Sequence, residues 1–125
     1  LRNKVLFFGK SNEINELLCY SDIFILPSEK ESFGLAALEA MIHKVPVIST
    51  NAGGLSEVNI NGISGFLSEV GDIDNMAKNT IRILSSPRIR EKFQDGAYKQ
   101  AIKFDISKII PLYESVYTRV LKSFI

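Results

Sequence analysis

Cysteine, histidine and tryptophan are scarce in this sequence. Its 125 residues include one Cys, one His and no Trp. A single cysteine, Cys19, cannot form an intrachain disulfide, and one Cys with one His falls short of the ligand set of a structural zinc site. The sequence therefore predicts no disulfide framework, no metal site and a reducing, cytoplasmic location. Cys19 lies in the apolar run 17–20, where we expect a buried packing role.

Long apolar runs and an excess of charge are also missing. No run approaches the roughly 20 residues that a membrane-spanning helix needs, and no signal peptide is recognisable. Lys and Arg together number 15 and Asp and Glu 14, so the charge gives no indication of nucleic-acid or anionic-membrane binding. A length of 125 residues with 46% hydrophobic content indicates one globular domain. Because the strand pattern starts at once, without an initiator Met, we expect a piece of a longer protein.

Short apolar runs that alternate with helical patterns dominate the first part of the chain. Strands are expected at 4–9, 23–26, 45–49 and 65–68, and helices at 12–20, 33–43 and 55–59. Further helices are expected at 72–84, at 88–103 and from Asp105 to the end, with Pro111 either kinking the last one or marking its start. The pattern predicts an α/β fold, a Rossmann-like parallel sheet flanked by helices, as a single domain over 1–125 with extra C-terminal helices.

The loops that leave the carboxyl ends of the strands are the expected place for a ligand. The sequence offers three, at 9–11, 28–32 and 50–54. The middle loop leads into a helix that begins near Gly34. A helix start presents free backbone N–H groups and a partial positive charge, so this point favours a phosphate.

Two glutamates stand near this helix start. Glu39 lies on a helix that is apolar nearly all round, which predicts a buried helix and a carboxylate that either faces a cleft or pairs with His43 one turn later. Glu31 lies in a charged loop, where plain solvation is the simpler interpretation. From the residues alone, both alternatives stay open for each glutamate.

Several motifs in a fixed order carry a resemblance to a known family. They are Glu31 and Glu39 with seven residues between them, Val-Pro-Val at 45–47, Gly53-Gly54 followed by Glu57, Asn61-Gly62 and Gly-Phe-Leu at 65–67. This set resembles the family 4 glycosyltransferases and their E-x7-E signature over about residues 4 to 85. Two positions depart from the family pattern: Lys44 replaces a glycine, whose left-handed conformation Lys44 is expected to adopt, and Ser56 replaces a proline.

The resemblance implies the C-terminal, donor-binding half of a GT-B fold in a retaining glycosyltransferase. It implies that Glu39 binds the ribose of the donor and that Glu31 is catalytic and binds the donor sugar. The remaining substrate-binding residues that it implies are Ser32, Phe33, Gly34 and Leu35 around the sugar and diphosphate, and Gly9 and Lys10 beside the base. It implies no cofactor and no metal, because fixed hydrogen-bond donors would stabilise the leaving group.

A narrower resemblance, through segments 7–10, 28–35 and 68–72, is to a bacillithiol-pathway subfamily that transfers N-acetylglucosamine from UDP-GlcNAc to L-malate. The family resemblance also implies a separate N-terminal acceptor domain, and a basic pair for the diphosphate on an upstream strand–loop unit outside these residues. Two alternatives stay open: a non-catalytic nucleotide-sugar-binding or interaction module, and an enzyme with a glycan or lipid acceptor. The apolar stripe of the last helix, which ends in Val120, Leu121 and Phe124, implies contact with the acceptor domain or self-association.

Overall fold

A parallel sheet forms the centre of the computed structural model, which describes residues 2–125. The strands β1 (Phe24–Leu26), β2 (Val47–Thr50) and β3 (Gly65–Ser68) follow the order β1-β2-β3. Phe24 lies opposite Val47 on one side of β2, and Val47 lies opposite Gly65 on the other. All four residues of β2 are buried, which is expected of a central strand with helices on both faces. The predicted α/β fold is therefore confirmed.

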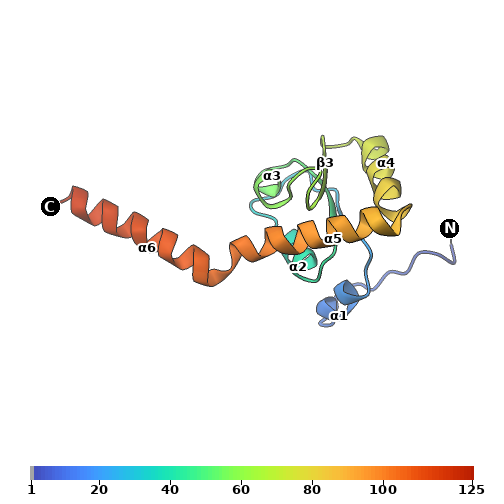
Figure 1. The fold of residues 1–125 in the computed structure, drawn as a ribbon, viewed down its shortest axis with the longest axis horizontal. Helices are drawn as coiled ribbons and strands as arrows, with labels where there is room; N and C mark the ends of the chain where they lie inside the picture. The colour runs from blue at the N-terminus through green and yellow to red at the C-terminus, as the bar shows by residue number, and fades with distance from the viewer. Residues whose placement is uncertain (1) are drawn as a thin grey trace.

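Helices pack on both faces of this sheet (Figure 1). The helices that precede the last one are α1 (Ile14–Cys19), α2 (Leu35–Ile42), α3 (Leu55–Val58), α4 (Ile73–Leu84), α5 (Pro87–Ala101) and the short 3₁₀ helix η1 (Ile102–Phe104). The last helix, α6 (Ile106–Ser123), does not pack on the sheet. The core on one face joins α2, α3 and the end of α5, and the core on the other face joins α4 and the start of α5.

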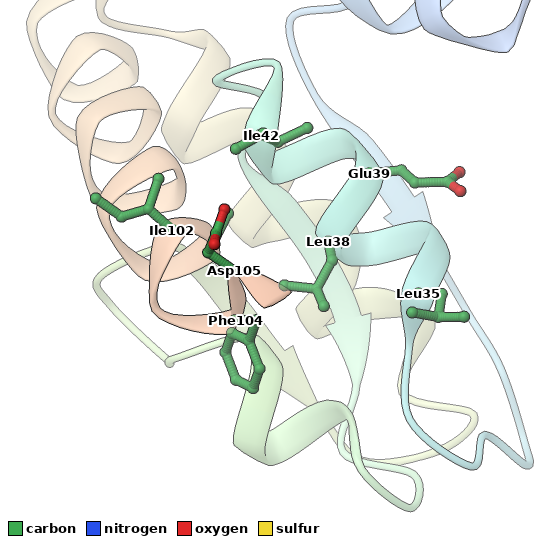
Figure 2. A pocket seen from close by; sticks show the side chains of 8 residues that line it. Leu35, Leu38, Glu39, Ile42, Ile102, Phe104 and Asp105 are labelled. Carbon is green, nitrogen blue, oxygen red and sulfur yellow. The ribbon is translucent and has the colours of Figure 1, made fainter. Parts of the chain in front are cut away.

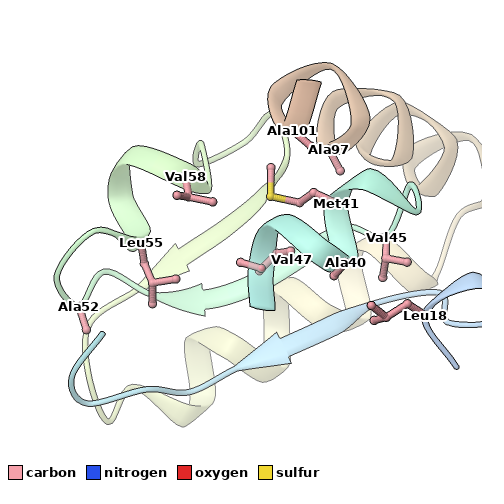
Figure 3. Packing of buried hydrophobic residues seen from close by; sticks show 11 residues of the cluster. Leu18, Ala40, Met41, Val45, Val47, Ala52, Leu55, Val58, Ala97 and Ala101 are labelled. Atoms are coloured by element: carbon pink, nitrogen blue, oxygen red, sulfur yellow. The ribbon is translucent and has the colours of Figure 1, made fainter. Parts of the chain in front are cut away.

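Alternation along β2 assigns neighbouring side chains to the two cores. Val47 packs with Met41 and Leu55, and alanines of α2 and α5 let these helices approach the sheet closely (Figure 3). Ile48 packs with Ile83 on the opposite face. The sheet is thus held from both sides, and the ends of its strands are fixed in space.

A buried asparagine ties the centre of the sheet together. Asn59 follows α3 and has no exposed surface. Its Nδ2 donates to the carbonyl oxygen of Val47 at 3.1 Å and to Ser49 Oγ at 2.9 Å, and its Oδ1 accepts from Ser64 Oγ at 2.8 Å. The side chain therefore connects β2 with the segment that leads into β3.

The strand predicted at 4–9 is wrong for this structure. Residues 5–8 have irregular backbone, and Val5, Leu6, Phe7 and Phe8 are between 54% and 92% exposed. A strand needs a neighbour for its backbone hydrogen bonds. Within residues 2–125, β1 pairs only with β2, and no strand lies beside 4–9 to supply those bonds.

Two local predictions had opposite outcomes. Cys19 is exposed rather than buried, because Leu18 is the residue of α1 that reaches the core. Lys44 has the left-handed conformation expected at a glycine position, with φ 61°. The Lys44 ammonium lies 5.6 Å from the centroid of the Tyr98 ring, a cation–π contact that offsets part of the backbone strain.

The last helix, α6, extends away from the rest of the molecule (Figure 1). None of its residues is buried, and it begins at Ile106, so Pro111 lies inside it and does not mark its start. Asp105 caps the helix by accepting a hydrogen bond from Ser107 N at 2.8 Å. The hydrogen bonds from Ser107 lower the pKa of the Asp105 carboxyl below its usual value. No helix in the described part of the chain is long and apolar enough to cross a membrane.

Replacing Asn59 should weaken the whole fold. Asn59→Ala leaves buried oxygens of Val47 and Ser64 without their partner, which we expect to lower the free energy of unfolding by about 3 kcal/mol. Asn79→Ala is the matched control, because Asn79 is part-buried on α4 and makes one side-chain bond, to Asn75. That variant should stay within about 0.5 kcal/mol of the parent chain. Urea unfolding followed by circular dichroism measures both, and equal stabilities would contradict the central role of Asn59.

Candidate functional site

The loop between β1 and α2 is the centre of the candidate site. All strands are parallel, so this loop and the one after β2 leave the same edge of the sheet. A hydrogen bond joins them directly, since Thr50 Oγ1 donates to the carbonyl oxygen of Ser28 at 2.6 Å. The structure therefore brings together the predicted loops 28–32 and 50–54.

The predicted loop at 9–11 does not join them. Gly9 has φ 64° and open space around its Cα, and Lys10 is exposed. In the described structure, no hydrogen bond or ring contact connects either residue with the loop after β1. Their predicted place beside a base stays a prediction.

The start of α2 has the features expected of a phosphate site. Gly34 occupies the N-cap position with φ 98°, a conformation that favours glycine. A Cβ at Gly34 would also lie 2.8 Å from Leu55 Cδ2, so a side chain there would require the Leu55 side chain to shift. With glycine as the N-cap, no side chain caps the helix, and its first N–H groups are available to a ligand.

Glu39 projects from the outer face of α2. It is exposed and shares that face with Leu35 and Ile42, which are 66% and 45% exposed. The buried face consists of Ala37, Ala40 and Met41. The expectation of an almost completely buried helix is therefore wrong, because only the face with Ala37, Ala40 and Met41 packs against the sheet.

His43 is not the partner of Glu39. Its Nδ1 lies 3.3 Å from Cys19 Sγ, and its Nε2 lies 3.4 Å from Asn15 Oδ1. Among residues 2–125, the single salt bridge joins Arg90 and Asp22. The carboxylate of Glu39 thus makes no bond within the described chain and is free to bind a ligand.

A hollow of about 270 Å³ lies between α2 and the turn after α5. Its lining is mostly apolar and consists of Leu35, Leu38, Glu39, Ile42, Ala101, Ile102, Phe104 and Asp105. Figure 2 shows the carboxylate of Glu39 directed away from Phe104 and Asp105. A ligand of Glu39 should therefore lie on the other side of α2, outside this hollow.

Glu31, Ser32 and Phe33 occupy the loop just ahead of α2. Glu31 is half-buried, Ser32 is exposed and Phe33 is 40% exposed. The ring of Phe33 meets that of Phe104 edge to face, with 5.8 Å between the centroids. This contact links the loop to η1. Sequence reasoning missed both Phe104 and Thr50 as supports of the loop, since neither stands out in a motif.

The carboxylates and the backbone N–H groups of the site favour different chemical groups of a ligand. Glu31 precedes the start of α2 and Glu39 lies on its second turn, so the N–H groups of the helix start lie between the two glutamates along the chain. A carboxylate repels a phosphate and accepts hydrogen bonds from hydroxyl groups. The arrangement suits a ligand with hydroxyl groups at both ends and phosphates between them.

Comparison with known proteins gives the site a context. The family described as glycosyl transferases group 1 matches residues 1–100. N-acetyl-alpha-D-glucosaminyl L-malate synthase of Bacillus anthracis is 41% identical over 98% of this chain and 32% of that protein. The capsular polysaccharide biosynthesis glycosyltransferase CapM of Staphylococcus aureus is 32% identical over 81% of this chain and 27% of its own length. The chain thus spans about a third or less of these relatives.

Solved structures agree with the fold. HepE of Anabaena, crystallised in complex with UDP, superposes with a TM-score of 0.85 at 26% identity, over 94% of this chain and 33% of that one. The C-terminal domain of the group 1 family protein LpcC of Francisella tularensis has a TM-score of 0.70 at 33% identity, over 80% of this chain and 51% of that one. These likenesses confirm the predicted Rossmann-like arrangement and the extra C-terminal helix.

Proposed function

The chain belongs to the glycosyl transferases group 1 family, and we propose that it is the donor-binding domain of a retaining GT-B glycosyltransferase. One observation supports this most directly. The glutamates of the E-x7-E pair, Glu31 and Glu39, flank an uncapped helix start at the carboxyl edge of a parallel sheet. A nucleoside diphosphate sugar has the matching order of groups: ribose hydroxyls, then phosphates, then sugar hydroxyls.

In this proposal Glu39 accepts hydrogen bonds from the ribose hydroxyls, and Glu31 binds the transferred sugar. The backbone N–H groups of Phe33, Gly34 and Leu35 hold the diphosphate and stabilise the charge that develops on the leaving group. Glu39 lies on a helix packed into the core, whereas Glu31 lies in a loop. Nucleotide binding and sugar placement therefore depend on different parts of the structure.

The donor that we propose is UDP-N-acetylglucosamine, and the acceptor is L-malate. The support is the relative that is 41% identical over nearly the whole chain and carries these groups in its name. HepE bound to UDP supports a uridine nucleotide. We further propose that an N-terminal domain supplies the acceptor site and that α6, none of whose residues is buried here, packs against it.

Ribose binding by Glu39 is tested by Glu39→Gln in the full-length protein. Because a hydrogen bond to a charged group contributes about 1.5–3 kcal/mol, we expect UDP affinity to fall about 10- to 100-fold. Glu91→Gln, at an exposed position of α5, is the matched control and should bind UDP normally. Titration calorimetry measures both variants, and unchanged UDP affinity in Glu39→Gln would remove this role.

The role of Glu31 is tested by separating binding from transfer. Glu31→Ala should lower kcat with UDP-GlcNAc and L-malate by about 100-fold or more, since it removes a group that acts at the reacting sugar. The Kd for UDP should change little. Glu29→Ala, in the same loop and exposed, serves as the control and should leave both quantities unchanged. Parallel losses of UDP affinity and kcat in Glu31→Ala would show that the role is misassigned.

The isolated chain 1–125 should not transfer sugar. Holding two reactants in place accounts for about 7–11 kcal/mol of a catalysed barrier, and in this proposal the acceptor lies on another domain. Chromatography of a reaction with UDP-GlcNAc and L-malate should show product with the full-length protein and only background with the isolated chain. Clear glycoside formation by the isolated chain would rule out the two-domain arrangement.

A further inference from the structure

The loop that carries Glu31 has no regular structure of its own. Residues 27–34 connect β1 to α2 without helix or strand hydrogen bonds. A catalytic group needs a fixed position, and a displacement of about 1 Å can cost a factor of about 100 in rate. Neighbouring parts of the chain must therefore hold this loop in place.

The segment that follows β2 packs against this loop and supports it. A Cβ added at Gly53 would lie 1.7 Å from the carbonyl oxygen of Glu31. A Cβ at Gly54 would lie 2.7 Å from the carbonyl oxygen of Ser32 and 3.0 Å from Phe33 Cα. The two loops thus meet backbone against backbone, and no space remains for a side chain between them.

The two glycines face different residues of the loop between β1 and α2: Gly53 faces Glu31, and Gly54 faces Ser32 and Phe33. Gly53 also has φ 51°, so both its conformation and its contact favour glycine. Gly54 has φ −73°, which any residue adopts, so its contact alone excludes a side chain. Thr50 completes the support: it is 1% exposed and holds the carbonyl oxygen of Ser28 at the start of the loop.

We propose that Gly53 is a positioning residue for sugar transfer: its missing side chain lets the backbone of Glu31 rest on the loop after β2, and this sets the position of the Glu31 carboxylate. The inference rests on the proposed role of Glu31 at the donor sugar. Glu39 does not depend on this support, because the buried residues Ala40 and Met41 anchor its helix. The contact of Gly53 with Glu31 therefore acts on sugar placement and leaves the ribose contact of Glu39 alone.

The decisive variant is Gly53→Ala in the full-length protein. Its methyl group must push the Glu31 backbone away by more than about 1 Å, so we expect kcat with UDP-GlcNAc and L-malate to fall about 100-fold. The Kd for UDP should weaken by less than about 10-fold, since Glu39 and the helix start at Gly34 and Leu35 lie outside this contact. Gly71→Ala is the matched control, because Gly71 also has positive φ, 86°, but no atom within 4 Å of its added Cβ. It should keep both kcat and Kd.

A double variant shows whether Gly53 acts through Glu31. If it does, Gly53→Ala should cause little further loss of kcat in a Glu31→Ala background, because the group that it displaces is already gone. Losses that multiply in the double variant would overturn the proposal. So would a fall in kcat for Gly71→Ala as large as that for Gly53→Ala.

A crystal structure of Gly53→Ala separates this inference from the proposed function. Glu31 Cα should be displaced by more than about 1 Å relative to the parent protein, and an unmoved Glu31 would overturn the inference whatever the enzyme transfers. If Glu31→Ala alone leaves transfer intact, the proposed function of Glu31 is wrong. The displacement of Glu31 Cα in Gly53→Ala still decides whether Gly53 determines the position of the loop.

Thr50 provides a second test in case Gly53→Ala does not fold. Thr50→Val has nearly the same shape but cannot donate to the carbonyl oxygen of Ser28, whereas Thr50→Ser keeps the hydroxyl group. We expect Thr50→Val to lower kcat about 10-fold at normal UDP affinity, and Thr50→Ser to restore most of it. Equal kcat values for the two variants would contradict the proposed support of the loop.

Discussion

The buried position of β2 is the constraint on which the rest of the structure depends. The strand has neighbours on both edges and helices on both faces, so any shift would disturb two cores at once. The amide of Asn59 fixes it further by bonding to Val47 and Ser49. A buried polar group that is fully bonded specifies one arrangement, since any other arrangement leaves bonds unmade. The candidate site is held by the same strand, because Thr50 at the end of β2 donates a hydrogen bond to the loop that carries Glu31.

This dependence separates the two glutamates of the proposed site. Glu39 is held through a helix whose small residues press against the core. Glu31 is held through backbone contacts between two loops. A helix in a packed core resists local displacement, whereas an irregular loop keeps its shape only as long as its neighbours do. In the proposed enzyme, the nucleotide end of the donor therefore binds to a glutamate on a rigid helix. The reactive end binds to a glutamate whose position depends on the contact between the loops after β1 and β2.

The sequence predicts this fold well where local pattern and tertiary packing agree. The apolar runs at 23–26 and 45–49 indicate buried strands, and the structure contains β1 and β2 there because both strands have ladder partners. Only β2 is buried, however, since β1 lies at the edge of the sheet and leaves Ile25 48% exposed. The same type of run at 4–9 fails, since periodicity cannot reveal whether a partner strand is present. For Glu39, the sequence identifies an unusual carboxylate but cannot show that His43 turns toward Cys19 instead. Likewise, Gly53-Gly54 predicts a turn, yet only the structure shows which backbone rests on it.

The exposed helix α6 has the geometry of a lever. It has 18 residues, so at 1.5 Å per residue it is about 27 Å long, and it is attached to the body only at its first end. A rotation of about 10° around Asp105 would move its far end by about 5 Å, given this length. The turn from η1 to α6 lies beside Phe104, which touches Phe33 in the site loop. The contact between Phe33 and Phe104 therefore places the loop between β1 and α2 next to the pivot from which α6 extends.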